Sequence, residues 1–211
     1  MLGTHDLLLF IGSGLLLNVT PGPDTLYIVG RSSQGLRAGI VAALGIGAGI
    51  LVHITAAALG LSAILAASAN AFAVLKLLGA AYLIYVGISL VFSAPTALDG
   101  DASLRLAPAS LRSIFAQGFL TNVLNPKVAL FFLAFLPQFV GQDAPNKSLA
   151  FLFLGLIFNV NGTLWNLFIA WSAARLTAGL SRRSAVLKWF NRCVGGIFVA
   201  LGIRLALERQ G

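Results

Sequence analysis

The chain is poor in several residue types on which redox enzymes and metal proteins depend. Among its 211 residues only 9% carry a charge, and there are two histidines, six acidic residues and one cysteine. The single Cys193 excludes an internal disulfide and a two-thiol redox cycle within one chain. The scattered imidazoles and carboxylates suggest no cluster of metal ligands. We therefore expect neither an enzyme nor a protein with a resident metal or cofactor.

Apolar residues are present in large excess. Hydrophobic residues make up 58% of the chain, and 23 residues are glycine. This is more apolar surface than a water-soluble fold of this length exposes, and small residues let membrane-spanning helices approach closely. The sequence predicts an all-α integral membrane protein. Its net charge of +8 then marks loop anchors that face anionic lipid, so membrane lipid is an expected partner and nucleic acid is not.

Six apolar runs are long enough to span a bilayer core of about 30 Å, which needs roughly 20 residues per helix. They cover approximately residues 7–30, 40–65, 72–92, 114–140, 149–173 and 189–207. A polar connection with proline and glycine, at about 95–112, separates the first three runs from the last three. We expect one transmembrane domain over 1–211, with a first unit at about 1–94 and a second at about 113–211.

Lysine and arginine are distributed unevenly between the two ends of these spans. On one side the connections carry Arg31, Arg37, Arg105, Arg112, Arg175, Arg182, Arg183, Lys188 and Arg192. The opposite side carries Lys76, Lys147, Arg204 and Arg209. Because positive residues favour the cytoplasmic side of a membrane protein, the loop at 95–112 is expected in the cytoplasm. Both termini are expected on the other side.

Two short motifs interrupt apolar runs: N-V-T-P-G-P-D at 18–24 and N-V-L-N-P-K at 122–127. Proline removes a backbone donor and clashes with the preceding turn, so helices 1 and 4 should break there and leave carbonyls that need partners. Pro23 or Pro21 suits the start of a new half-helix with Asp24 in its first turn, and Asn125 is the expected N-cap before Pro126. The candidate binding and translocation residues are Asn18, Thr20, Pro21, Gly22, Pro23, Asp24, Asn122, Asn125, Pro126 and Lys127.

The motifs belong to a longer internal similarity. At an offset of 104, three positions of the first span recur in the fourth, where Gly118, Asn122 and Val123 match Gly14, Asn18 and Val19. With one added residue, Pro21 would match Pro126. The third and sixth spans share a second pattern of glycines and apolar residues, at 79–90 and 195–205. Because a duplicated unit with an odd number of spans enters the membrane from the opposite side, we expect two inverted three-helix repeats.

The chemistry of two broken helices favours a small ligand that carries both charges. Half-helix N-termini attract a carboxylate, while freed carbonyls or Asp24 can hold an ammonium group, so an amino acid is the expected substrate. A metal ion or another small polar solute is the alternative. A structural ion pair between Asp24 and Lys127 is the competing explanation for the two charges. Asp24 and His53, a residue type that exchanges protons near neutral pH, are the candidates for proton coupling.

Two other sets of residues allow more than one role. The fifth span contains three amides that could bond to neighbouring helices or to a ligand, namely Asn159, Asn161 and Asn166. The second span has a face of small residues made by Gly45, Gly47 and Gly49. This face could pack within the monomer or against a second copy, so a homodimer is a further expectation.

Several segments in a fixed order carry a likeness to a known family. Besides the first motif they are G-L-R-A-G-I at 35–40, L-K-L-L-G-A-A-Y-L-I-Y-V-G at 75–87, Q-G-F-L-T-N-V-L-N-P-K at 117–127 and F-L-A-F-L-P-Q-F at 132–139. Along nearly its whole length the chain resembles the LysE/RhtB family of bacterial amino-acid exporters. The resemblance implies a six-span secondary transporter that exports amino acids or their derivatives across the bacterial plasma membrane, coupled to the proton gradient. It also marks as hallmarks Pro21, Gly22, Pro23, Asn125, Pro126 and Lys127.

Overall fold

A computed structural model describes residues 2–63 and 106–175, with scattered single positions at 74–92 and 192–203. Within these residues the chain is helical, and the only strand-like pairing is an isolated bridge between Thr4 and Val140. The elements are α1 (Leu7–Val19), α2 (Pro23–Ser32), α3 (Leu36–Ala56), η1 (Ala57–Leu61), α6 (Leu111–Val123), α7 (Pro126–Leu130), η2 (Phe131–Phe135), η3 (Leu136–Phe139) and α8 (Lys147–Arg175). The third and sixth expected spans, and most of the loop at 95–112, lie outside the described residues.

Two helical segments in the described part are long and apolar enough to cross a membrane unbroken. One is α3 continued by the π-helical η1, Leu36–Leu61, with 26 residues, and the other is α8, with 29. A third candidate consists of α6 and the segment Pro126–Phe139, bent by 45° where they meet. The first expected span is also broken, into α1 and α2. The predicted breaks in helices 1 and 4 are therefore confirmed, and the second and fifth spans lie close to their predicted bounds.

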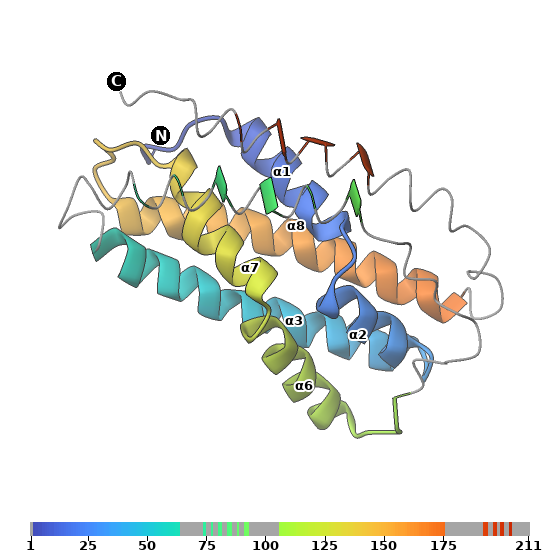
Figure 1. Ribbon diagram of the computed structural model, residues 1–211. Helices are drawn as coiled ribbons and strands as arrows, with labels where there is room; N and C mark the ends of the chain where they lie inside the picture. Colours follow the sequence, from blue (N-terminus) through green and yellow to red (C-terminus); the bar gives the residue numbers. More distant parts are fainter. Residues whose placement is uncertain are drawn as a thin grey trace.

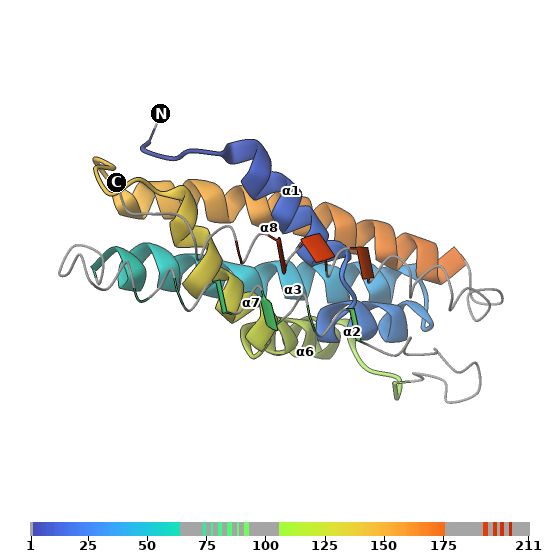
Figure 2. The same cartoon turned by 45° about the horizontal axis from the view of Figure 1, so that its top comes forward.

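The two long helices form the back of the molecule, and the two broken helices lie against them. Figure 1 shows α3 and α8 side by side and running in opposite directions. The α6 helix packs mainly on α3, while α1 packs on α8 and α2 on both. In Figures 1 and 2 the chain runs one way through α1 and α2 and the opposite way through α6 and α7. The two breaks consequently face each other near the middle of the bundle.

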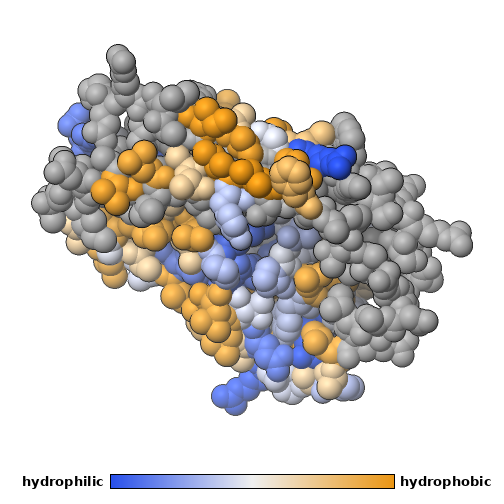
Figure 3. Space-filling view, viewed as in Figure 1, coloured by the Kyte–Doolittle hydropathy of each residue, from blue (hydrophilic) through white to orange (hydrophobic). Residues whose placement is uncertain are grey.

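The polar residues of this face gather around the breaks. In the space-filling view of Figure 3, hydrophilic residues occupy the middle of the molecule, while hydrophobic residues cover α1 and much of the surrounding surface. Beneath that surface a cluster of packed aromatic rings joins α1, η2, η3 and α8 through Phe10, Phe131, Phe135, Phe139 and Phe158. Burial of such rings anchors the second half of the broken α6–α7 helix against α1 and α8.

The small-residue face of α3 packs inside the chain. A Cβ atom on Gly49 would lie 2.8 Å from the carbonyl oxygen of Phe119, and one on Gly45 would meet the Phe115 carbonyl, both on α6. A Cβ on Gly47 would lie 2.8 Å from Oγ1 of Thr163 on α8. The glycines thus allow α6 and α8 to approach α3 closely. The open question about this face is settled in favour of packing within the monomer.

Arg31 corrects one expectation, because it is not a loop anchor that faces lipid. It lies in the last turn of α2 and is only 4% exposed. Its guanidinium donates to the carbonyl oxygen of Ala107 (2.8 Å) and to Oε1 of Gln117 (2.6 Å), and it lies over the ring of Tyr27. A planar guanidinium can satisfy several neutral acceptors at once, and the C-terminal end of a helix favours a cation. This combination explains how a charge that the sequence suggested for a loop is buried between α2 and α6.

Candidate functional site

The first break follows from the chemistry of its two prolines. Pro21 has no N–H, so the carbonyl of Leu17, four residues earlier, loses its helical donor. Consequently α1 ends at Val19, and a short extended connection leads to Gly22, the N-cap of α2. Pro23 begins α2, and Asp24 lies in its first turn, where the helix dipole favours a negative charge.

The second break repeats this pattern with a different cap. Here α6 ends at Val123, and Asn125 caps α7 through its side-chain oxygen, which accepts a hydrogen bond from the backbone N–H of Lys127 at 3.0 Å. Pro126 begins α7, as the sequence predicted. Because Pro126 has no N–H, the carbonyl of Asn122 also loses its helical donor. Each break therefore frees at least one carbonyl in a place that water does not reach easily.

The helix starts correct the proposed match between Pro21 and Pro126. Counted from these starts, Pro126 corresponds to Pro23, because both are the first residue of a half-helix. Pro21 lies two residues earlier, in the extended connection. Asp24 and Lys127 then occupy the same position in their half-helices, directly after the proline. The two breaks thus present opposite charges at equivalent places.

Lys127 is held by the end of the first half-helix. Its ammonium donates to the carbonyl oxygens of Leu17 at 2.6 Å and of Thr20 at 2.8 Å. The Leu17 carbonyl is the group that Pro21 leaves without a donor. A positive charge is unfavourable at the N-terminus of α7, but the C-terminal carbonyls of α1 compensate for it. Lys127 therefore completes the hydrogen bonding of carbonyls that lie 107 and 110 residues away in the sequence.

Asp24 is held in the same way by the other break. Oδ2 of Asp24 accepts a hydrogen bond of 2.9 Å from the side-chain amide of Asn122, in the last turns of α6, and the Asn125 amide interacts with the same carboxylate. The two charges attract each other across the cavity between them. A structural ion pair was the competing explanation, yet Leu17, Thr20 and Asn122 supply hydrogen bonds to the two charges from the opposite break. Several groups therefore share in holding the two broken helices together.

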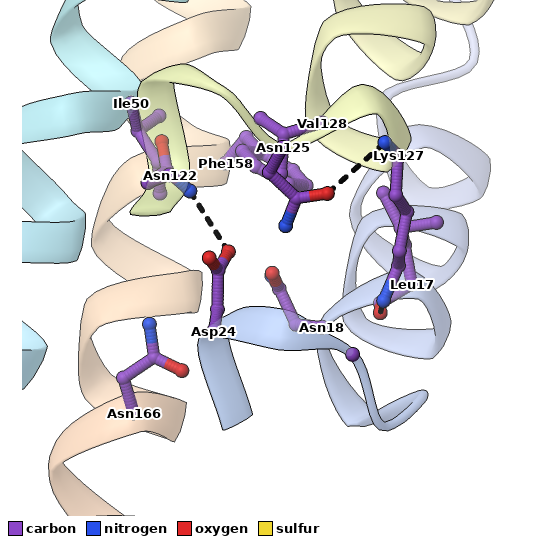
Figure 4. Close-up of a pocket in the computed structure, with 11 residues that line it drawn as sticks. Leu17, Asn18, Asp24, Ile50, Asn122, Asn125, Lys127, Val128, Phe158 and Asn166 are labelled. Atoms are coloured by element: carbon purple, nitrogen blue, oxygen red, sulfur yellow. Dashed lines mark hydrogen bonds between the residues drawn. The ribbon is translucent and has the colours of Figure 1, made fainter. Parts of the chain in front are cut away.

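A small cavity lies where these residues converge. Its lining contains Leu17, Asn18, Gly22, Asp24, Ile50, Asn122, Asn125, Lys127, Val128, Phe158 and Asn166. Its volume of about 20 Å³ is little more than the ~10–15 Å³ that one water molecule needs. Figure 4 shows Asn18, Asp24, Asn122 and Asn125 pointing toward one another in this space. The broken helices surround it together with α3 and α8, which contribute Ile50, Phe158 and Asn166.

Three buried polar atoms at the cavity have no hydrogen-bond partner in the described part of the chain. They are Nδ2 of Asn18, Oδ1 of Asp24 and Oδ1 of Asn122. Buried polar atoms are almost always satisfied in proteins, because leaving one unpaired costs about 1–3 kcal/mol. One donor and two acceptors at a single cavity therefore indicate a place for a ligand that has both kinds of group.

The sequence predicted part of this lining and missed the rest. Six of the ten candidate residues line the cavity, whereas Thr20 and the three prolines act on the backbone that surrounds it. Asn166, one of the three amides of the fifth span for which the sequence left two roles open, lies in the cavity lining. The feature of the sequence that could have identified Asn166 is an amide side chain in an otherwise apolar helix. The apolar lining residues Leu17, Ile50, Val128 and Phe158 carry no signal that distinguishes them from other core residues.

His53 lies behind the cavity. Its Nε2 atom is 3.1 Å from the backbone carbonyl oxygen of Asn122, the carbonyl that Pro126 leaves without a helical donor. Its ring stacks on Phe132 of η2, with the centroids 5.9 Å apart. The imidazole therefore contacts the cavity residue Asn122 directly, and Phe132 links it to the cavity residue Phe158.

Comparison with known proteins gives this arrangement a family. The family model of the LysE type translocator matches residues 15–209, which include both breaks. The chain belongs to this family. LysE type translocators are membrane transport proteins rather than a class of enzyme, and the apolar helices of this one agree with several passes through a membrane.

Relatives of this LysE type translocator match it over almost its full length. It is 31% identical to an uncharacterized membrane protein of Pseudomonas aeruginosa over 208 residues, 97% of this chain and 96% of that protein. It is 32% identical to the uncharacterized membrane protein YrhP of Bacillus subtilis, over 97% of this chain and 100% of that one. It is 27% identical to a leucine efflux protein of Klebsiella pneumoniae, over 97% and 96% of the two chains. No solved structure matches.

Proposed function

We propose that the protein is a secondary transporter that exports amino acids or their derivatives across the bacterial inner membrane. The observation that carries this proposal is the cavity between the two breaks. It combines opposite charges from equivalent helix positions with one unpartnered donor and two unpartnered acceptors. An α-amino acid has an ammonium and a carboxylate on the same carbon, so a single small ligand can satisfy all of these groups.

Each end of the amino acid has a place in this proposal. The ammonium group binds at Oδ1 of Asp24, an unpartnered acceptor, beside the Asn122 amide that holds this carboxylate. The carboxylate binds at Nδ2 of Asn18, on the side where the charge of Lys127 attracts it. Charged groups leave water only when they are paired and hydrogen-bonded. This arrangement gives the ammonium and the carboxylate each an opposite charge and a hydrogen-bond partner.

The apolar part of the lining suggests the kind of side chain. Leu17, Ile50, Val128 and Phe158 supply hydrocarbon to the lining of the cavity. An aliphatic amino acid with an uncharged side chain is the best match for them, and the leucine efflux protein of Klebsiella pneumoniae, to which the chain is similar, supports this choice. The closed cavity is too small for such a ligand, so the half-helices must separate to admit it.

The transport cycle follows from the two opposed breaks. In this proposal six spans form two inverted three-helix repeats, with both termini outside the cytoplasm. The substrate enters from the cytoplasm, the site closes, and one repeat rocks against the other to release the substrate outside. A proton taken up by Asp24 from the outside returns the empty carrier, which couples export to the proton gradient.

Proteoliposomes loaded with labelled solute test this function. We expect efflux of leucine to accelerate when the outer medium is acidified. The efflux rates of homoserine and lysine, compared with that of leucine, measure the preference for a side chain. Zn²⁺ as a further cargo represents the metal alternative, although the described residues contain no group of three His, Cys, Asp or Glu side chains. The proposal fails if no amino acid moves under any gradient, and Zn²⁺ transport would establish the alternative.

A further inference from the structure

We infer that His53 is a positioning residue that orients Asn122, whose side-chain amide holds Asp24 in place for the ammonium group of the substrate. This inference rests on the proposed function, because it concerns the same site. It gives His53 a role that does not require the imidazole to carry the coupling proton. Three observations about its surroundings and the chemistry of the imidazole support it.

The first observation is the group to which His53 donates. Pro126 leaves the Asn122 carbonyl without a helical donor, and two groups replace that donor. The backbone N–H of Asn125 lies 2.9 Å from the carbonyl oxygen, and Nε2 of His53 lies 3.1 Å from it. A carbonyl oxygen has two lone pairs, so the two donors together satisfy it. Nε2 therefore carries the proton in this contact.

The second observation is that His53 contacts both sides of the break. The hydrogen bond reaches Asn122 at the end of α6, while the imidazole stacks on Phe132 of η2 at an interplanar angle of 26°. Phe132 is buried and also packs edge-on against Phe158, a cavity residue. Since His53 is part of the long helix α3, its imidazole holds the end of α6 and the η2 segment in place relative to α3.

The third observation concerns the side chain of Asn122. This residue is fully buried, and its Nδ2 donates to Asp24. Gly49 of α3 lies so close that a Cβ atom there would approach the Asn122 Cβ to 2.8 Å and its Oδ1 to 3.0 Å. Asn122 is thus fixed from one side by Gly49 and through its carbonyl by His53. A small rotation of its backbone would move Nδ2 away from Asp24, the residue that binds the ammonium group.

The chemistry of the imidazole makes this role independent of its protonation. An imidazole with Nε2–H donates to a carbonyl, and an imidazolium donates from the same nitrogen. The contact therefore persists in both charge states. A glutamine side chain can also direct an N–H toward the same carbonyl, whereas leucine keeps only the apolar packing.

Transport by substituted proteins separates positioning from proton transfer. We expect His53→Leu to raise the half-saturation concentration for leucine about tenfold, the effect of one lost hydrogen bond, with a smaller change in maximal rate. His53→Gln should restore most of the affinity and keep the response to an imposed pH gradient. Thr55→Val is the matched control, because the Thr55 hydroxyl bonds within its own helix, to the Leu51 carbonyl. It should leave both constants unchanged.

Two outcomes would overturn the inference. If both His53 variants transported like the parent, Asn122 would not depend on the imidazole. If His53→Gln lost the response to the pH gradient while keeping its affinity, His53 would be a proton carrier instead. A parent protein that moves no amino acid would overturn the proposed function. The hydrogen bond between His53 and the Asn122 carbonyl can still be tested then, by a measurement that needs no substrate.

That measurement is nitrogen-15 NMR of the imidazoles. The chain has two histidines, and His5→Gln at the exposed N-terminus leaves His53 as the only signal. We expect the Nε2–H tautomer with a shift typical of a hydrogen bond. Replacement of Pro126 by alanine returns a backbone N–H that competes for the Asn122 carbonyl, so this shift should move toward that of a weaker bond. An Nδ1–H tautomer in the parent would contradict the positioning role.

Discussion

The Lys127 ammonium donates to the Leu17 carbonyl at 2.6 Å, and this is the carbonyl that Pro21 leaves without its helical donor. His53 makes the corresponding contact to the Asn122 carbonyl, which Pro126 leaves free. Each break in the bundle is thus completed by a donor from a distant part of the chain. The groups that stabilise the breaks are also the groups that surround the cavity, so movement of the half-helices changes the site directly.

Removal of the Lys127 ammonium should destabilise the protein. Lys127→Met leaves the buried carbonyls of Leu17 and Thr20 without this donor, and we expect a loss of about 2–5 kcal/mol in the free energy of unfolding, since each unsatisfied acceptor costs about 1–3 kcal/mol. Thermal unfolding of the purified protein measures the change. Lys147→Met is the control, because the Lys147 ammonium bonds an exposed carbonyl, that of Gln142, and should change stability by less than about 1 kcal/mol.

Addition of Pro21→Ala should offset part of that loss. Alanine returns the N–H that the Leu17 carbonyl lacks, so the double variant should be more stable than the sum of the two single changes by about 1 kcal/mol, a coupling typical of groups that share a partner. A double-mutant cycle of unfolding free energies gives this coupling. Strict additivity would mean that Pro21 and Lys127 act on separate groups.

Loss of the Asp24 charge should weaken substrate binding. Asp24→Asn retains an oxygen that can accept from Asn122 but removes the negative charge for the ammonium group. Because a hydrogen bond to a charged group contributes about 1.5–3 kcal/mol, we expect the half-saturation concentration to rise about 10- to 100-fold. Transport should also lose its response to an acidic outer medium. Asp143→Asn, on an exposed loop, should behave like the parent; equal loss in both variants would remove the special role of Asp24.

A methyl group on Gly49 should disturb both packing and transport. The added Cβ would lie 2.8 Å from both the Phe119 carbonyl oxygen and the Asn122 Cβ, so α3 and α6 must separate. We expect Gly49→Ala to cost about 1–3 kcal/mol, the usual effect of overpacking. Gly60→Ala is the matched control, because nothing lies within 4 Å of its added Cβ. It should preserve stability or raise it by about 0.5–1 kcal/mol. Similar effects of the two substitutions would argue against close contact of α3 with α6.

The buried guanidinium of Arg31 should resist conservative replacement. A lysine ammonium lacks the planar fork with which Arg31 bonds both Ala107 and Gln117 while lying over the Tyr27 ring, so Arg31→Lys should lose about 1–3 kcal/mol of stability, nearly as much as Arg31→Met. Unfolding temperatures of the two variants test this. Arg37→Gln provides the comparison, since Arg37 is exposed at the start of α3. A parent-like Arg31→Lys would show that charge alone matters at this position.

The breaks could be predicted from sequence because their causes are local. A proline without an N–H, an Asn125 side chain two residues before Lys127 and a carboxylate in the first turn of α2 act over a few residues. The correspondence of Pro126 with Pro23 required the helix starts, because Pro21 and Pro23 are equally good candidates from the sequence. The same limitation hid the equivalence of Asp24 and Lys127.

The partners of these groups could not be predicted, because they depend on packing between distant helices. Nothing in the sequence directs Lys127 to Leu17 or His53 to Asn122. Burial of Arg31 depends on acceptors from residues 107 and 117, which only the fold brings together. The apolar cavity wall is equally hidden, since Phe158 and Ile50 are two among many hydrophobic residues in a chain that is 58% hydrophobic.

Competition binding tests most directly whether one cavity recognises both charges of an amino acid. Labelled leucine is bound to the purified protein in lipid nanodiscs and displaced by leucine, by leucinamide, which lacks the carboxylate, or by 4-methylpentanoate, which lacks the ammonium group. We expect each analogue to bind at least about tenfold more weakly than leucine, since each loses a charge-assisted hydrogen bond. Displacement by either analogue as effectively as by leucine would contradict the two-charge site.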